Sequence, residues 1–152
     1  MAFSCECNQT KGLRQEIKIR DYVLLGRILT LDSIIIVDSV ELANQNKNPN
    51  VTRESNRTHF PVARYSIEVS AIYKGKFASD AIELYSLIEK SYCGLKLKVG
   101  SEYVIYANKS PEKITDHMTI FPQGEGIVWS HRCNRTREVN KEELSSLKNY
   151  FK

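Results

Sequence analysis

The sequence of 152 residues contains no long hydrophobic run, no block of like charge and no internal repeat. Its longest apolar stretch, Ile34 to Val37, is far shorter than the roughly 20 residues that a membrane-spanning helix needs. The formal net charge is +4, and the Lys and Arg residues are scattered among Asp and Glu. Nucleic-acid binding usually depends on clustered cations, so the charge pattern does not favour a nucleic-acid partner.

Common catalytic signatures are missing as well. The sequence has no Gly-x-Ser-x-Gly nucleophile motif, no His-Glu-x-x-His zinc motif and no glycine-rich phosphate loop. Its three histidines, His59, His117 and His131, are far apart in the sequence and are expected to lie separately on the surface. We therefore expect a protein that binds another protein, that is not an enzyme and that needs no cofactor.

Alternating apolar and polar residues predict a mainly β fold. From Arg64 to Tyr73 every second residue is apolar, as in a strand with one buried face and one wet face. Residues 34–42 either continue a first strand or form a second, and the polar residues 43–58 predict an exposed loop. The other predicted strands are 21–31, 81–87, 95–99, 102–107, 118–121 and 127–129.

Two helices are predicted to flank these strands. Leu13 and Ile17 have helical spacing in a short N-terminal segment. Residues 140–151 carry a helix start signal, because Asn140 can cap the helix and Glu143 follows three residues later, as in a capping box. We expect this C-terminal helix to dock on the strands.

Together these elements predict one domain over residues 1–152, a small closed barrel of the oligonucleotide/oligosaccharide-binding (OB) type with flanking helices. Tyr65, Tyr73, Tyr103 and Trp129 fall on apolar strand faces and are predicted to lie in the core. The alternative function, from a different class, is binding of single-stranded nucleic acid or an oligosaccharide, in which exposed aromatic residues of the barrel stack on the ligand.

The residues before the first cysteine predict export. Ala2-Phe3-Ser4 places small residues at positions −3 and −1 relative to Cys5, as signal peptidase prefers. We expect residues 1–4 to be the end of an export signal or an added start, and the protein to be secreted or on the cell surface. An upstream lipid-anchor signal, which would attach Cys5 to a lipid, is the alternative.

Four cysteines in a small exported chain predict two disulfides. Cys5 and Cys7 are too close to bridge each other without strain, so each is expected to reach Cys93 or Cys133. Either arrangement would tie the N-terminal segment to the barrel. The alternatives are free thiols and a zinc site, although the Cys-x-x-Cys knuckles of structural zinc sites are absent.

A set of short motifs, in this order, resembles a known family. The motifs are Cys5-Glu6-Cys7, Tyr65-Ser66-Ile67-Glu68-Val69, Ile72-Tyr73-Lys74-Gly75, Ser91-Tyr92-Cys93-Gly94, Glu102-Tyr103-Val104-Ile105-Tyr106 and a late Cys133. Over about residues 5–135 the chain resembles the netrin-like module, specifically the N-terminal domain of the tissue inhibitors of metalloproteinases. The resemblance implies a five-stranded OB barrel with flanking helices, and the disulfides Cys5–Cys93 and Cys7–Cys133.

The resemblance also implies a mechanism. In these inhibitors the first cysteine is the mature N-terminus, and its α-amino nitrogen and carbonyl oxygen bind the catalytic zinc of the protease and displace the zinc-bound water. Carried over to this chain, Cys5 would bind the zinc of a partner metalloendopeptidase and Glu6 would enter the specificity pocket. Ser91, Tyr92 and Cys93 would form the flanking ridge. The chain itself would hold no metal and would be a monomer.

Three features differ from the family pattern. Met1 to Ser4 precede Cys5 and would block its amine until they are removed. Glu6 is charged where the family has a small uncharged residue, and a carboxylate is costly to move into an apolar pocket. Four cysteines are present where the family's inhibitory domain has six. The alternative within the family is therefore a netrin-like interaction module without inhibitory activity.

Overall fold

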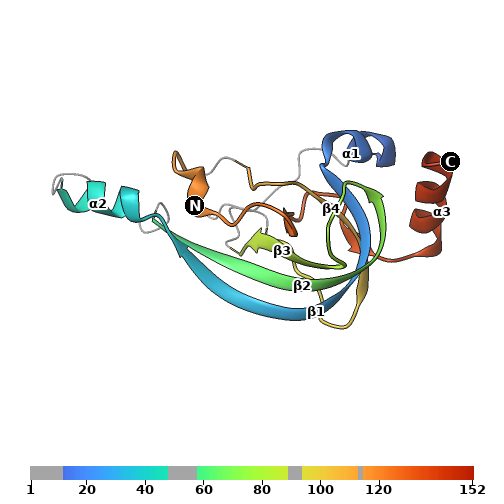
Figure 1. Cartoon of the computed structure of the whole chain (residues 1–152), viewed down its shortest axis with the longest axis horizontal. Coiled ribbons are helices and arrows are strands. Elements are labelled where there is room, and N and C mark those ends of the chain that lie inside the picture. The colour runs from blue at the N-terminus through green and yellow to red at the C-terminus, as the bar shows by residue number, and fades with distance from the viewer. Residues whose placement is uncertain (1–11, 48–57, 89–93, 113–114) are drawn as a thin grey trace, which may run out of the picture.

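A computed structural model describes residues 12–47, 58–88, 94–112 and 115–152 (Figure 1). The elements, in chain order, are α1 (Leu13–Ile19), β1 (Tyr22–Val37), α2 (Ser39–Lys47), β2 (His59–Lys74), β3 (Ala81–Leu87), β4 (Glu102–Ala107), the 3₁₀ helix η3 (Met118–Ile120), β5 (Ile127–Trp129), β6 (Arg137–Glu138) and α3 (Lys141–Tyr150). None of the helices in the described part of the chain is long and apolar enough to cross a membrane.

The strands form one mixed six-stranded sheet in the order β5-β3-β2-β1-β4-β6. β1, β2 and β3 make an antiparallel meander, and β4 pairs antiparallel with both β1 and β6. β5 pairs parallel with β3. In Figure 1, β1 and β2 run together as a long curved ribbon toward α2, whereas α1 and α3 lie at the opposite end of the molecule.

A closed barrel is not confirmed. The residue after β4, Asn108, forms one isolated antiparallel bridge with Trp129 of β5, and each backbone N–H donates to the other carbonyl oxygen at 2.8 Å. One bridge does not make a ladder, so the sheet is open. The mainly β class, the helix over Leu13–Ile19 and the C-terminal helix agree with the sequence predictions.

The end of the first strand was predicted wrongly. β1 is continuous to Val37, but residues 39–47 form α2 and not a strand or a loop. The reason is a side-chain cap: Asp38 Oδ1 accepts the Glu41 N–H at 3.0 Å and satisfies a backbone donor in the first turn of this helix. The remainder of the predicted loop, residues 48–57, lies outside the described residues.

Two further predicted strands are wrong. Residues 118–120 form a short 3₁₀ helix, and residues 95–98 have no regular secondary structure and do not belong to the sheet. Leu95 and Leu97 are nevertheless both buried. The alternating pattern therefore predicted the burial of these side chains correctly, but it wrongly predicted that the segment pairs with the sheet.

The core consists of three apolar clusters. The largest lies between the sheet and residues 95–97, and it contains Tyr65 and Tyr103. The second contains Trp129, and the third joins Ile17 of α1 to Leu147 of α3 across β1 and β4. Tyr65, Tyr103 and Trp129 are buried, as predicted. Tyr73 is half-buried, and its ring stacks on that of Phe151.

Candidate functional site

The residues predicted to bind a protease lie outside the described residues. These residues are Cys5, Glu6, Ser91, Tyr92 and Cys93, and the same holds for Cys7 and for residues 1–4. Cys133 is the one predicted disulfide residue that falls in the described part of the chain. The described residues on either side of the predicted site show how its segments are attached.

The chain enters and leaves residues 89–93 at one point of the fold. On the entering side, Ile88 N donates to Pro61 O of β2 at 3.0 Å. On the leaving side, Gly94 packs so closely on the preceding strand end that an added Cβ would lie 3.1 Å from the Ile88 Cα and nearer still to the Leu87 carbonyl oxygen. The glycine of the Cys-Gly motif therefore has a steric role: it allows the two ends of the loop to touch.

Tyrosine hydroxyls hold the segment that leaves this loop. Tyr65 Oη donates to Leu95 O at 3.0 Å and accepts the Leu97 N–H at 3.2 Å. Tyr103 Oη accepts the Lys98 N–H at 2.9 Å. Burial raises the pKa of Tyr65, which keeps its hydroxyl protonated and able to donate. These side-chain bonds replace the strand ladder that the alternating sequence had predicted.

Cys133 lies in a turn that is fixed by a histidine. Its backbone N–H donates to His131 Nδ1 at 3.1 Å. This bond requires a neutral ring that carries its proton on Nε2. The Nε2 atom lies 3.4 Å from Glu112 Oε1. Burial lowers the pKa of His131 and favours this neutral form, and the residue is half-buried.

None of the cysteines in the described residues is free, and Cys133 is the one cysteine there. The three cysteines that the sequence offers as its partners, Cys5, Cys7 and Cys93, lie outside the described residues. The pairings Cys5–Cys93 and Cys7–Cys133 therefore stay predictions.

The N-terminal helix is attached beside Cys133. Glu16 of α1 is buried, and its Oε1 accepts the Arg135 N–H at 2.7 Å. Its Oε2 accepts from Arg20 Nε at 2.8 Å. The bond from Arg135 places α1 against the chain two residues after Cys133 in sequence.

A buried carboxylate joins α3 to the sheet. Glu143 accepts from Arg135 Nε and Nη2 at 2.7 and 2.8 Å, and from Tyr106 Oη at 2.5 Å. Burial alone would raise the pKa of Glu143, but the hydrogen bonds from Arg135 and Tyr106 hold it below its usual value. Asn140 caps the helix as predicted, because its Oδ1 accepts the Glu143 N–H at 2.8 Å. The return bond of a capping box is replaced by the bonds to Arg135 and Tyr106.

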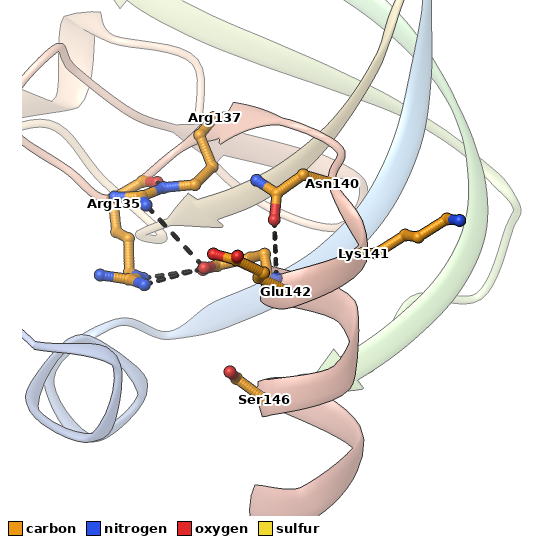
Figure 2. Close-up of a pocket in the computed structure, with 7 residues that line it drawn as sticks. Arg135, Arg137, Asn140, Lys141, Glu142 and Ser146 are labelled. Atoms are coloured by element: carbon orange, nitrogen blue, oxygen red, sulfur yellow. Dashed lines mark hydrogen bonds and ion pairs between the residues drawn. The ribbon is translucent and has the colours of Figure 1, made fainter.

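Figure 2 shows a pocket of about 370 Å³ beside this carboxylate, where α3 begins. Its walls carry charges of both signs, and Arg135 is already engaged by Glu143. The arrangement therefore fixes α3 and does not select a ligand of one charge. The lining residues are Arg135, Arg137, Asn140, Lys141, Glu142, Glu143 and Ser146.

A second buried carboxylate, that of Asp38, was not predicted from the sequence. Besides capping α2, it accepts from Thr115 Oγ1 at 2.8 Å and from His117 Nδ1 at 2.9 Å. Burial acts to raise the pKa of Asp38, yet the bonds from the Glu41 amide, His117 and Thr115 hold it below the usual value. The side chain thus ties the far end of the β1–β2 ribbon to residues 115–117. In the described ranges, no group of three or more His, Cys, Asp and Glu side chains is placed to hold a metal ion.

No family profile and no curated protein matches the chain.

Proposed function

We propose that the chain is an exported, disulfide-stapled, netrin-like module that binds and inhibits a zinc metalloendopeptidase. Its binding wedge consists of Cys5 and Glu6 at the N-terminus, flanked by the ridge Ser91, Tyr92 and Cys93. The α-amine and carbonyl oxygen of Cys5 bind the zinc of the protease and displace the water that the metal would activate. An α-amine has a pKa of about 8, so a substantial neutral fraction is available near physiological pH.

The observation that carries the proposal is the closed base of the ridge loop. Ile88 and Gly94 lie in contact, and Ile88 is hydrogen-bonded to the sheet. A binding segment whose two ends are fixed at one point loses less conformational entropy on binding than a free one. A disulfide from Cys93 to Cys5 would add the N-terminus to the same base.

The strand arrangement supports the fold that the resemblance implies. An OB fold is a five-stranded, partly open barrel. Here the first five strands are neighbours in the sheet, in the order β5-β3-β2-β1-β4. The bridge between Asn108 and Trp129 joins the two ends of this set. We therefore propose that this bridge marks the closing edge of an OB-like barrel, with β6 added outside it.

The position of α1 supports the second disulfide. The bond from Arg135 N to Glu16 holds the helix against the segment that contains Cys133. Cys7 is six residues before Leu13, the first residue of this helix, so we propose that it pairs with Cys133. The two disulfides would fix both residues that flank Glu6.

The nucleic-acid alternative has less support. Of the four aromatic residues on the predicted strand faces, Tyr65, Tyr103 and Trp129 are 2%, 6% and 3% exposed. The fourth, Tyr73, is half-buried, and its ring stacks on Phe151. Stacking requires an accessible ring face. We therefore do not propose nucleic-acid binding.

Inhibition is tested with two forms of the protein, one beginning at Cys5 and one retaining Met1 to Ser4. We expect the Cys5 form to inhibit at least one member of a panel of zinc endopeptidases, and the longer form to lose this inhibition because its amine is blocked. Acetylation of the Cys5 amine is the matched control and should abolish inhibition without unfolding the protein. Equal inhibition by all three forms would exclude the amine mechanism. Binding without inhibition by the Cys5 form would favour the non-inhibitory module.

The specificity pocket is tested with Glu6→Ser in the Cys5 form. Because the carboxylate must be desolvated to enter an apolar pocket, the substitution should strengthen inhibition by about tenfold or more. Peptide mapping without reduction should recover Cys5 joined to Cys93 and Cys7 joined to Cys133. Recovery of free thiols would contradict the staples.

A further inference from the structure

Over more than half of its length, the outer edge of β1 is not paired with any strand in the described part of the chain. β4 covers this edge only from Tyr22 to Arg27, and backbone bonds to residues 100–101 extend the cover to Ile28. From Leu29 to Val37, the one strand paired with β1 among the described residues is β2, on the other side. Figure 1 shows β1 as the outer strand of the curved ribbon that leads to α2.

The open edge lacks the usual protection against pairing. Natural edge strands carry proline, lysine or other charges that prevent a second strand from adding. Between Leu29 and Val37 there is no proline or lysine, and the one charged residue is Asp32. Its carboxylate lies 3.2 Å from Arg64 Nη2 of β2, which offsets the charge.

Exposed apolar side chains repeat along the same edge. Leu29, Leu31, Ile35 and Val37 are 45%, 45%, 64% and 41% exposed. They occupy alternate positions on either side of Ser33. Alternate residues of a strand share one face, so Leu31, Ile35 and Val37 form a single apolar stripe interrupted only by Ser33.

The backbone groups of these residues point outward. Asp38 N donates to Thr58 O of the β2 side, so the even-numbered residues of this part of β1 direct their backbone groups to β2. The odd-numbered residues 31–37 then direct theirs to the open edge. Ile28 is even-numbered, but its backbone groups bond to residues 100–101 and not to β2. The reason is a β-bulge between residues 28 and 30, which changes whether the odd- or the even-numbered residues face β2.

We propose that this edge pairs with the same edge of a second copy of the chain, antiparallel about a two-fold axis at Ser33. In this register Leu31 of each copy lies opposite Ile35 of the other, and the two Ser33 residues lie opposite each other. Each odd-numbered residue of one copy thus lies opposite an odd-numbered residue of the other. Both residues of such a pair direct their backbone groups outward, as a hydrogen-bonded pair of an antiparallel ladder requires. The result is a continuous sheet across the two copies, joined through an interface that uses the same surface twice.

Self-complementarity is the reason for choosing a second copy over another partner. Leu31 and Ile35 are symmetric about Ser33, so pairing of the edge with itself matches each of these exposed apolar residues with the other. Moving the axis to Asp32 places Leu31 opposite Ser33, and moving it to Ile34 places Ile35 opposite Ser33, so either shift loses this match. No charged side chain lies on the matched face, so the net charge of +4 on each copy does not enter the contact directly. The proposal replaces the monomer expected from the sequence, and it is independent of the proposed inhibition.

The first test measures the mass of the full-length protein by sedimentation equilibrium over a range of concentrations. We expect a monomer–dimer equilibrium, and we expect Ile35→Lys to weaken dimerisation by roughly 100-fold because it puts two unpaired charges into an apolar stripe. Ile72→Lys is the matched control, because Ile72 of β2 is 40% exposed and pairs with Leu24, outside the open part of β1. It should leave the dimer unchanged. A wild-type protein that stays monomeric at several hundred micromolar, or equal dissociation by both variants, would overturn the proposal.

The second test fixes the register. Opposed residues of a hydrogen-bonded pair have Cα atoms about 5.5 Å apart, which is within disulfide range. Ser33→Cys should therefore give a covalent dimer under mild oxidation, seen without reduction on a gel. Thr30→Cys, also exposed on this part of β1, should not, because the two Thr30 positions are six residues out of register. Equal crosslinking of both variants would contradict the register, and a ladder of larger species would contradict a closed dimer.

Discussion

Glu16 Oε1 accepts the backbone N–H of Arg135 at 2.7 Å across 119 residues of sequence. The carboxylate is 1% exposed, and its other oxygen is bonded to Arg20 at 2.8 Å. A buried carboxylate with donors on both oxygens is stabilising only while both donors are present. This contact therefore makes the attachment of the N-terminal helix to the Cys133 segment sensitive to a single side chain.

We predict that Glu16→Ala lowers the free energy of unfolding by about 2–4 kcal/mol, because it leaves the Arg135 amide and the Arg20 guanidinium without their acceptor. Glu16→Gln should cost less, since an amide oxygen can still accept from Arg135. Urea-induced unfolding of the purified variants measures both effects. Glu142→Ala is the control, because Glu142 is exposed, and it should change stability by about 0.5 kcal/mol at most.

Gly94→Ala should destabilise the protein by about 1–3 kcal/mol, since its Cβ would overlap the Leu87 carbonyl and force the base of the ridge loop apart. Gly12→Ala is the matched control, because no atom lies within 4 Å of a Cβ added there and its φ is −67°. Thermal unfolding of the two variants should separate them clearly. In the Cys5 form, Gly94→Ala should also weaken protease inhibition under conditions in which the variant is still folded. Equal melting temperatures would refute the steric role of Gly94.

Tyr65→Phe should free two buried backbone groups, Leu95 O and Leu97 N, and lower the free energy of unfolding by about 1–3 kcal/mol. The more specific readout is hydrogen exchange, which should accelerate at the Leu97 amide while amides of β1 stay protected. Tyr150→Phe is the control, because Tyr150 is 38% exposed and lies at the end of α3. Unchanged exchange at Leu97 would contradict the role given to the Tyr65 hydroxyl.

The lowered pKa of His131 predicts a pH effect on stability. The unfolded state takes up the proton at about pH 6.5, whereas the folded state, in which burial disfavours the charged ring, takes it up only at lower pH. The unfolded state therefore binds more protons in this window, and stability should fall as pH decreases from about 6.5 toward the folded pKa. Urea unfolding across this range measures the slope.

Two variants check the assignment to His131. His131→Gln should flatten the slope, because Gln does not titrate and can still accept from Cys133 N. Glu112→Gln should extend the loss of stability to lower pH, since the Glu112 carboxylate raises the pKa of the ring. A slope that survives in His131→Gln would show that another group is responsible.

Sequence periodicity predicted those strands whose burial alternates by residue. In β2, Tyr65 and Ile67 are buried and Glu68 and Ser70 are exposed, as the alternating pattern indicated. The bounds of β3, β4 and β5 also agree with prediction. The pattern could not distinguish a strand from the segment around Leu95 and Leu97, because that distinction depends on distant hydroxyl groups that satisfy its amides.

Side-chain networks were predicted less well. The Asn140 cap is local and was found from its spacing. The role of Glu143 was missed, because its partners Arg135 and Tyr106 come from other parts of the chain. The Asp38 cap of α2 is local too, but its burial depends on Thr115 and the residues after it. The predicted wedge lies outside the described residues, and its cysteine pairings remain predictions.

The apolar cluster that joins α1 to α3 has a consequence for the making of the protein. Ile17 is among the first described residues to be synthesised, and Leu147, which covers it, is among the last. At the usual rate of synthesis, α1 therefore waits for several seconds without its apolar partner. The ribbon of β1 and β2 emerges in that interval with its apolar stripe exposed. Ile17 is fully covered only after Leu147 has been synthesised, so the docking of α3 is a late step in folding.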